Sequence, residues 1–243
     1  MDRLMPLAPL FDKTIITGDI IDYLTWGAVE YIQRYIYDRH PETLLVAGGH
    51  DVSWECQGKV RDTSSLESRQ EILQTVWKQD LYYHSEVLAD KVMLVLLNNG
   101  EHRYYSHQTE RLRADIRKAR QEERVVIIFQ HEPLCTRNEW ETAVVPLRVS
   151  QNGNPAPRNY HNGRAFIGNT ENTDGESMDM YRLITENADV VRAVFCGHTH
   201  NEGYTEISGW DMTGDVPQKR MIPQYILDAA AYDRGHMQMI TIR

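Results

Sequence analysis

Histidine and aspartate residues occur in four short motifs that are spread along the chain. They are Gly-Asp at 18–19 with Asp22 close behind, Gly-His-Asp at 49–51, His-Glu-Pro at 131–133 and Gly-His-Thr-His at 197–200. Imidazole and carboxylate groups suit Mn, Fe, Co or Zn better than Ca or Mg, and they also serve as catalytic acids and bases. The motifs therefore indicate a metal centre with acid–base chemistry, provided that the fold brings them together.

Each motif comes directly after a segment that predicts a β-strand. The predicted strands are 13–17, 43–47, 124–130 and 190–196, all of them short and rich in Val, Ile or Leu. In open α/β sheets the carboxyl ends of the strands form the crevice where ligands bind, so four motifs at that edge would meet in space. A lone histidine is more often a surface or hydrogen-bonded core residue than a ligand. The repeated placement at strand ends is what favours a shared site.

The remaining elements predict a mixed α/β fold. Further strands are predicted at 91–97, 203–208, 221–227 and 237–242, and helices at 28–39, 65–79, 108–122 (with Ser106 as its cap) and 178–187. The late strands have no helices between them, which indicates an antiparallel or mixed sheet that closes the fold. The length of 243 residues fits one domain, 1–243, with an irregular excursion at about 132–175 that would cover the site.

Composition excludes several classes of protein. The net charge is −9, whereas a general nucleic-acid binder carries an excess of Lys and Arg. A negative net charge does not exclude a phosphate substrate, because bound cations would attract it. Three cysteines without a CxxC pair indicate neither a disulfide framework nor a zinc ribbon. The apolar runs are too short to span a bilayer, and the first residues do not follow the pattern of a secretory signal. We therefore expect no membrane association and a cytoplasmic location.

Taken in order, the motifs resemble the signature of the calcineurin-like metallophosphoesterases. The matching residues are Gly-Asp-x-x-Asp at 18–22, Gly-x-His-Asp at 48–51, the lone His131, and Gly-His-x-His at 197–200. The resemblance implies a four-layer α/β/β/α sandwich of two mixed sheets flanked by helices, with metal ions at one end. It also implies an enzyme that hydrolyses a small phosphorylated substrate, a monoester or diester, through a metal-activated water that attacks phosphorus in line.

The resemblance assigns four residues to the metal ions. Asp19 resembles the carboxylate that bridges two ions. His131 and His198 resemble ligands of one ion, and His200 resembles a ligand of the other. The cofactors would be one or two divalent ions, with Mn, Fe or Zn best suited to these ligands.

Two further residues are assigned to the chemical step. His50 resembles the histidine that stabilises charge in the transition state or protonates the leaving oxygen, and Asp51 would orient it. Asp22 is not counted as a ligand, because it could equally cap the next helix or hold its own loop.

The pattern departs from the family at two places. No Asp-x-His motif precedes Asp19, and Gly49 stands where the family usually has Asn. We expect that the chain begins one strand late, by truncation or by natural loss, and that it binds about one metal ion or fewer. The retained histidines favour an active hydrolase. The alternative is a binding or scaffold module that has lost catalysis.

Overall fold

A pair of parallel strands and the helices packed on it make up the N-terminal part of the fold. In the computed structural model, β1 (Thr14–Ile16) pairs with β2 (Thr43–Leu45) in parallel. Between them lie α1 (Trp26–Tyr31) and the π-helix η2 (Ile32–Tyr37), and α2 (Leu66–Gln74) follows later. Side chains of η2, β2 and α2, among them Ile36, Leu45 and Leu73, form one buried cluster. The helices therefore cover the outer face of this small sheet.

The structure describes residues 5–53, 55–56, 59–60, 64–134, 145–146, 173–199, 203–227 and 239–241. Short elements near the start are the 3-10 helices η1 (Met5–Leu10) and η3 (His50–Val52) and the strands β3 (Glu55–Cys56) and β4 (Lys59–Val60). The predicted excursion at 132–175 lies mostly outside these residues, and the strand predicted at 237–242 lies partly outside them.

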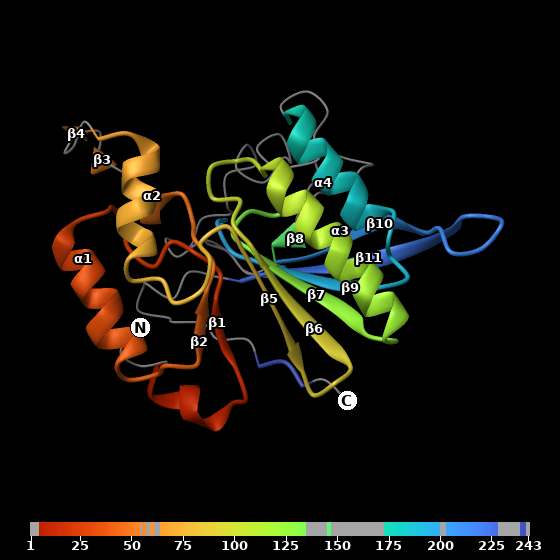
Figure 1. Ribbon diagram of the computed structural model, residues 1–243, viewed down its shortest axis with the longest axis horizontal. Helices are drawn as coiled ribbons and strands as arrows, with labels where there is room; N and C mark the ends of the chain where they lie inside the picture. The colour runs from red at the N-terminus through yellow and green to blue at the C-terminus, as the bar shows by residue number, and fades with distance from the viewer. Residues whose placement is uncertain are drawn as a thin grey trace.

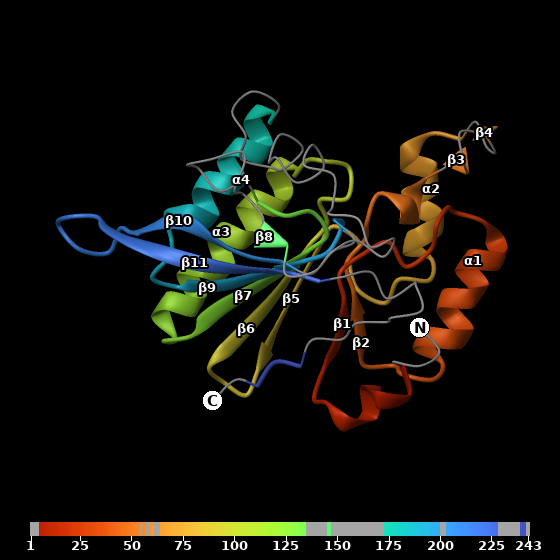
Figure 2. The same ribbon diagram turned by 180° about the vertical axis from the view of Figure 1, so that it is seen from behind.

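Seven strands of the described residues form the larger sheet. In spatial order they are β5 (Tyr83–Leu88), β6 (Val92–Leu97), β7 (Val125–Gln130), β9 (Val191–Cys196), β11 (Gln218–Ile226), β10 (Gly203–Asp211) and β8 (Val145–Pro146). The strands from β6 to β11 in this order run parallel, and the outer pairings are antiparallel. The parallel strands therefore end at one edge, as the sequence predicted. The β10–β11 hairpin extends beyond the rest of the sheet (Figure 2).

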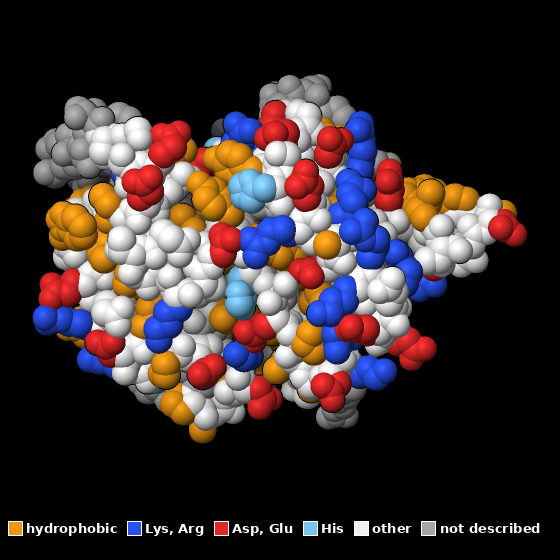
Figure 3. All heavy atoms as spheres, viewed as in Figure 1, with side chains coloured by type: hydrophobic (Ala, Val, Ile, Leu, Met, Phe, Trp, Pro, Cys, Tyr) orange, Lys and Arg blue, Asp and Glu red, His pale blue; other side chains and the backbone are white. Residues whose placement is uncertain are grey.

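Two helices cover the outer face of the larger sheet. They are α3 (Ser106–Gln121) and α4 (Gly175–Thr185), whose apolar side chains share a core with alternate residues of β6, such as Val95 and Leu97. The other residues of β6, such as Leu94, belong to a second core between the two sheets. A strand buried on both faces has no polar side to show, which explains the unbroken apolar run of β6. On this helical face, Lys and Arg side chains gather over α3 and α4 with acidic ones among them (Figure 3).

The core between the sheets completes the four layers. Leu44 and Val46 from the small sheet meet Phe129 and Phe195 from the large one, and the two phenylalanine rings stack with their centroids 5.3 Å apart. The layers follow the order helices, small sheet, large sheet, helices (Figure 1). The predicted α/β/β/α sandwich is confirmed, although the smaller sheet is a purely parallel pair within the described residues.

Local differences from the prediction have local causes. Ser106 is the first residue of α3 and not its cap, because Tyr105 holds the cap position and its backbone N–H donates to the side chain of Gln108 at 2.7 Å. Strand β5 was not predicted, since Tyr83–Leu88 alternates polar and apolar residues too weakly to stand out.

Among the helices that the structure describes, none combines the length and the apolar character needed to cross a bilayer.

Candidate metal centre

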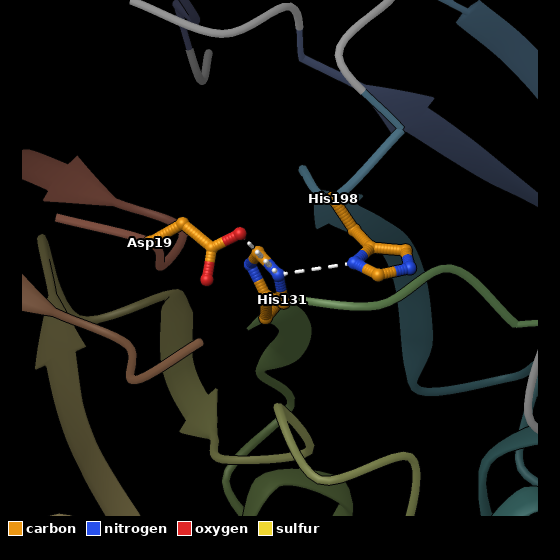
Figure 4. Close-up of side chains that lie close together, drawn as sticks. All are labelled: Asp19, His131 and His198. Carbon is orange, nitrogen blue, oxygen red and sulfur yellow. Dashed lines mark hydrogen bonds and ion pairs between the residues drawn. The ribbon is translucent and has the colours of Figure 1, made fainter. Parts of the chain in front are cut away.

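Three side chains from distant parts of the chain meet at the edge where the strands end. Asp19 follows β1, His131 follows β7 and His198 follows β9, and the three face one another (Figure 4). Asp19 Oδ2 lies 3.1 Å from His131 Nε2, which lies 3.2 Å from His198 Nδ1. One ligand atom from each residue lies within 4.8 Å of the others. The structure thus brings together three of the four predicted metal ligands, and His200 lies outside the described residues.

These distances fit a shared cation. Two ligand atoms that each lie about 2.1 Å from one ion, at an angle of roughly 90–110°, are about 3.0–3.4 Å apart. The N–H at Nδ1 of His131 donates to the carbonyl of Thr17 at 2.8 Å, so a neutral His131 presents the lone pair of Nε2 to Asp19 and His198. One carboxylate and two imidazoles form a donor set for Mn, Fe or Zn.

The charges of Asp19 and His131 stabilise each other. Burial disfavours the charged form of Asp19, but its hydrogen bond with His131 and the charge of that ring prevail and lower the pKa of Asp19 to about 2. Burial also lowers the pKa of His131, yet the hydrogen bond and charge of Asp19 outweigh it, so the pKa of His131 is raised. A cation at Nε2 competes with this proton, and binding would release it.

The backbone around the group adopts conformations that few residues accept. Gly18 has φ of +97°, and a Cβ there would stand 2.4 Å from Nδ1 of His131. Asp19 and His198 also have positive φ, 52° and 68°. Residues held in the left-handed region cost about 1–3 kcal/mol each and cluster at functional sites. In the Gly-Asp and Gly-His motifs, the glycine therefore lets the backbone lie close to neighbouring atoms, and the next residue offers a potential metal ligand.

Asn99 holds the turn that presents His131. Its side-chain oxygen accepts hydrogen bonds from the backbone N–H groups of His131 and Glu132, at 3.0 and 2.9 Å. Its amide nitrogen donates to the carbonyl of Glu132 at 3.0 Å. Asn99 was not among the residues predicted from the sequence. The signal available was its place two residues after the predicted strand at 91–97, at the same edge as the four motifs.

Asp51 does not orient His50, so that prediction is wrong. Its oxygens accept the backbone N–H groups of Ile20 at 2.8 Å, Ile21 at 3.0 Å and Gly48 at 2.8 Å. The side chain is fully buried, and burial raises its pKa to about 7 against the opposing effect of these N–H groups. These three N–H groups are its hydrogen-bond partners, and the ring of His50 is paired with Asp22 instead. Asp51 instead ties the loop of Asp19 to the loop after β2.

His50 is oriented by Asp22. Its Nδ1 lies 3.0 Å from the backbone carbonyl of Asp22 and 3.1 Å from Oδ1 of the same residue. The backbone N–H of His50 donates to Oδ1 of Asp19 at 3.0 Å, so the histidine is fixed directly beside the metal-ligand group. The imidazole is exposed to solvent and can reach a bound molecule.

A cleft of about 190 Å³ opens onto this group. Its lining residues are Asp19, Gly49, His50, Ser53, Gly100, His102, His131, Glu132 and His198. A larger hollow of about 380 Å³ lies beside Lys13, Thr43 and Asp80, but it contains neither of the two groups of potential metal ligands in the described residues. The smaller cleft is therefore the candidate site. His102 and Glu132 were not predicted, although Glu132 lies next to His131 in the sequence.

We expect Asp51→Ala to destabilise the fold by about 3–5 kcal/mol, because it leaves two buried N–H groups and one partly buried N–H group without an acceptor. Urea denaturation measures this loss. Asp51→Asn, which keeps one oxygen, should cost less.

The cost of Asp51→Ala also depends on pH. The pKa of Asp51 is raised from 3.8 to about 7, so its contribution to stability is complete below pH 4 and is lost as the pH rises through 7. The difference between the native chain and Asp51→Ala should therefore be larger at pH 5 than at pH 8. An equal difference at both values would show that Asp51 is ionised throughout.

Comparison with known proteins gives a match to a family and similarities to solved structures, two of which are described here. A family model described as calcineurin-like phosphoesterase matches residues 4–202. A dimetal phosphatase from Danio rerio is similar at 13% identity and TM-score 0.49, over 93% of this chain and 76% of that one. A phosphopantetheinyl hydrolase from Mycobacterium tuberculosis is similar at 10% identity and TM-score 0.41, over 89% and 79%. Neither similarity is strong enough to bear on the substrate. No curated protein matches the sequence.

Proposed function

The chain belongs to the calcineurin-like phosphoesterase family, and from this premise we propose that it is a metal-dependent hydrolase of phosphate esters. The observation that carries the proposal is the convergence of Asp19, His131 and His198 at separations that suit a shared cation. A structural ion pair would account for Asp19 and His131 alone. It would not account for a second imidazole nitrogen at the same point, nor for the positive φ of His198.

Asp19, His131 and His198 would hold one divalent ion, and His200 is proposed as a further ligand. When bound, divalent ions at such a centre supply Lewis-acid stabilisation of phosphoryl oxygens and a water of lowered pKa. The carboxylate of Asp19 lowers the positive charge of the centre and so favours binding of the ion. The hydrogen bond from His131 to Thr17 keeps that imidazole in a fixed orientation.

His50 would act on the leaving group. It lines the cleft, and Asp22 orients its ring through Nδ1, which leaves Nε2 for a bound ester. An imidazolium at this position can stabilise charge on the phosphoryl group and donate a proton to the departing oxygen.

The cleft suits the phosphoryl end of a small substrate. Sites that enclose an entire small ligand have volumes of about 300–1,000 Å³, more than the 190 Å³ found here. The phosphate group would therefore enter the cleft while the remainder of the ester stays outside it. Both monoesters and diesters meet this condition.

A binding module is the second candidate function. The observation in its favour is Gly49, which offers no side-chain oxygen to an ion. A centre with fewer ligands would bind a phosphorylated partner without cleaving it.

We expect the purified chain with added Mn²⁺ to release product from at least one ester in a panel of phosphomonoesters and phosphodiesters. Chelation should remove the activity, because the residues of the cleft provide no substitute for the charge of the ion. Product release measured on both ester classes also determines which class is the substrate. If no ester is cleaved although Mn²⁺ binds, the binding-module function replaces the hydrolase.

A further inference from the structure

A second group of potential metal ligands lies beside the first. One ligand atom each from His102, Glu132 and His198 lies within 4.8 Å of the other two. The rings of His102 and His198 meet edge to face, with centroids 5.8 Å apart. Among the described residues the two groups share His198, so this imidazole has further ligand-type side chains near it beyond Asp19 and His131.

Glu132 is the unusual member of this group, because a carboxyl group is buried with incomplete hydrogen bonding. Its side chain is 1% exposed. Oε1 lies 2.7 Å from Nδ1 of His102, while Oε2 has no hydrogen-bond partner among the described residues. Burial raises the pKa of Glu132, and the hydrogen bond and charge of His102 oppose this rise. A buried carboxylate of this kind is costly unless a cation or further donors meet it.

The fold brings His102 to the cleft through a close contact between two glycines. A Cβ on Gly49 would stand 2.6 Å from the carbonyl oxygen of Gly100, and a Cβ on Gly100 would stand 2.4 Å from the carbonyl carbon of Gly48. The loop after β6 therefore lies directly on the loop after β2. His102, two residues further on, has φ of +58° and lines the cleft.

An ordinary ion pair between His102 and Glu132 explains only part of this arrangement. It provides a partner for Oε1, while the buried Oε2 has none within the part of the chain that the structure describes. An exposed histidine also contributes little to stability by pairing with a single carboxylate, because water screens its charge. A cation that contacts the carboxylate would satisfy the group that the ion pair leaves unsatisfied.

We propose that His102, Glu132 and His198 form a divalent-cation site of their own, next to the site of Asp19 and His131. Its two imidazole nitrogens and one carboxylate suit Zn, Mn or Fe. His198 belongs to both ligand groups, and a neutral imidazole has one free lone pair, so this ring serves one of the two sites at a time. The proposal concerns cation binding and does not depend on hydrolysis of any ester.

The test measures Mn²⁺ binding from the EPR signal of the free ion, with Asp19→Asn as the starting protein. This variant weakens the first site, so the ion that remains reports on the second. We expect Asp19→Asn to keep one bound Mn²⁺, and we expect its affinity to fall at least tenfold when His102→Ala or Glu132→Gln is added. Glu123→Gln, on an exposed side chain, is the matched control and should change nothing.

Two results would overturn the proposal. Asp19→Asn that binds no Mn²⁺ would show a single site centred on Asp19, and unchanged binding after His102→Ala would show that His102 is not a ligand. The His102 side chain is 63% exposed, so its replacement tests the site even if Glu132→Gln does not fold. Failure of the hydrolase proposal looks different, because there the native chain binds Mn²⁺ and cleaves no ester.

Discussion

Asp19→Asn is expected to abolish ester hydrolysis, with a loss of at least about 10²–10³-fold, the usual effect of removing one group that stabilises transition-state charge. The substitution keeps the shape of the side chain and removes its negative charge. It also removes the partner that raises the pKa of His131. Initial rates at saturating Mn²⁺ measure the effect, so that weaker binding of the ion is separated from loss of catalysis.

Asp12→Asn is the matched control, because Asp12 is exposed, lies in the same part of the chain and does not line the cleft. It should retain full activity. If Asp19→Asn hydrolyses the ester at more than about a tenth of the native rate at saturating Mn²⁺, the carboxylate of Asp19 does not stabilise the transition state as proposed.

His50→Ala is expected to lower turnover by roughly 10²–10⁴-fold, the usual contribution of a positioned acid or base. Its ring is exposed and belongs to neither ligand group, so the metal content should stay at the native value. His131→Ala should instead lower metal content and turnover together, because His131 is buried within a ligand group. Turnover and metal analysis on the same preparations separate the two roles.

His107→Ala serves as control for both variants, since His107 is exposed on α3 and does not line the cleft. If His50→Ala loses metal as His131→Ala does, His50 is a ligand and not an acid. If it loses neither metal nor turnover, the leaving group receives its proton from another donor.

The sequence predicted the fold and the family because both depend on strong local patterns. The apolar runs of β6 and β7 are buried on both faces, so each is visible as a short block made mostly of Val, Ile and Leu. Strand β9 is a shorter apolar run in which the exposed Arg192 interrupts the pattern. The motifs after β1, β7 and β9 follow such blocks directly. Parallel strands that end at one edge then bring Asp19, His131 and His198 together without further information.

Contacts between loops could not be predicted in the same way. The spacing of His50 and Asp51 suggested a pair, but Asp51 turns inward to three backbone N–H groups and Asp22 takes its place beside His50. His102 reaches the cleft only because two glycine-containing loops lie on each other. Such a contact is set by tertiary packing and leaves no periodic pattern in the sequence.

The central claim is that a cation held by Asp19, His131 and His198 makes this chain a phosphoesterase. The most direct test measures ester hydrolysis by chelator-treated protein as Mn²⁺ is added back. The account predicts that hydrolysis is absent after chelation, rises with Mn²⁺ to a plateau in the native chain, and stays absent in Asp19→Asn. Hydrolysis that persists after chelation and is equal in Asp19→Asn would contradict it.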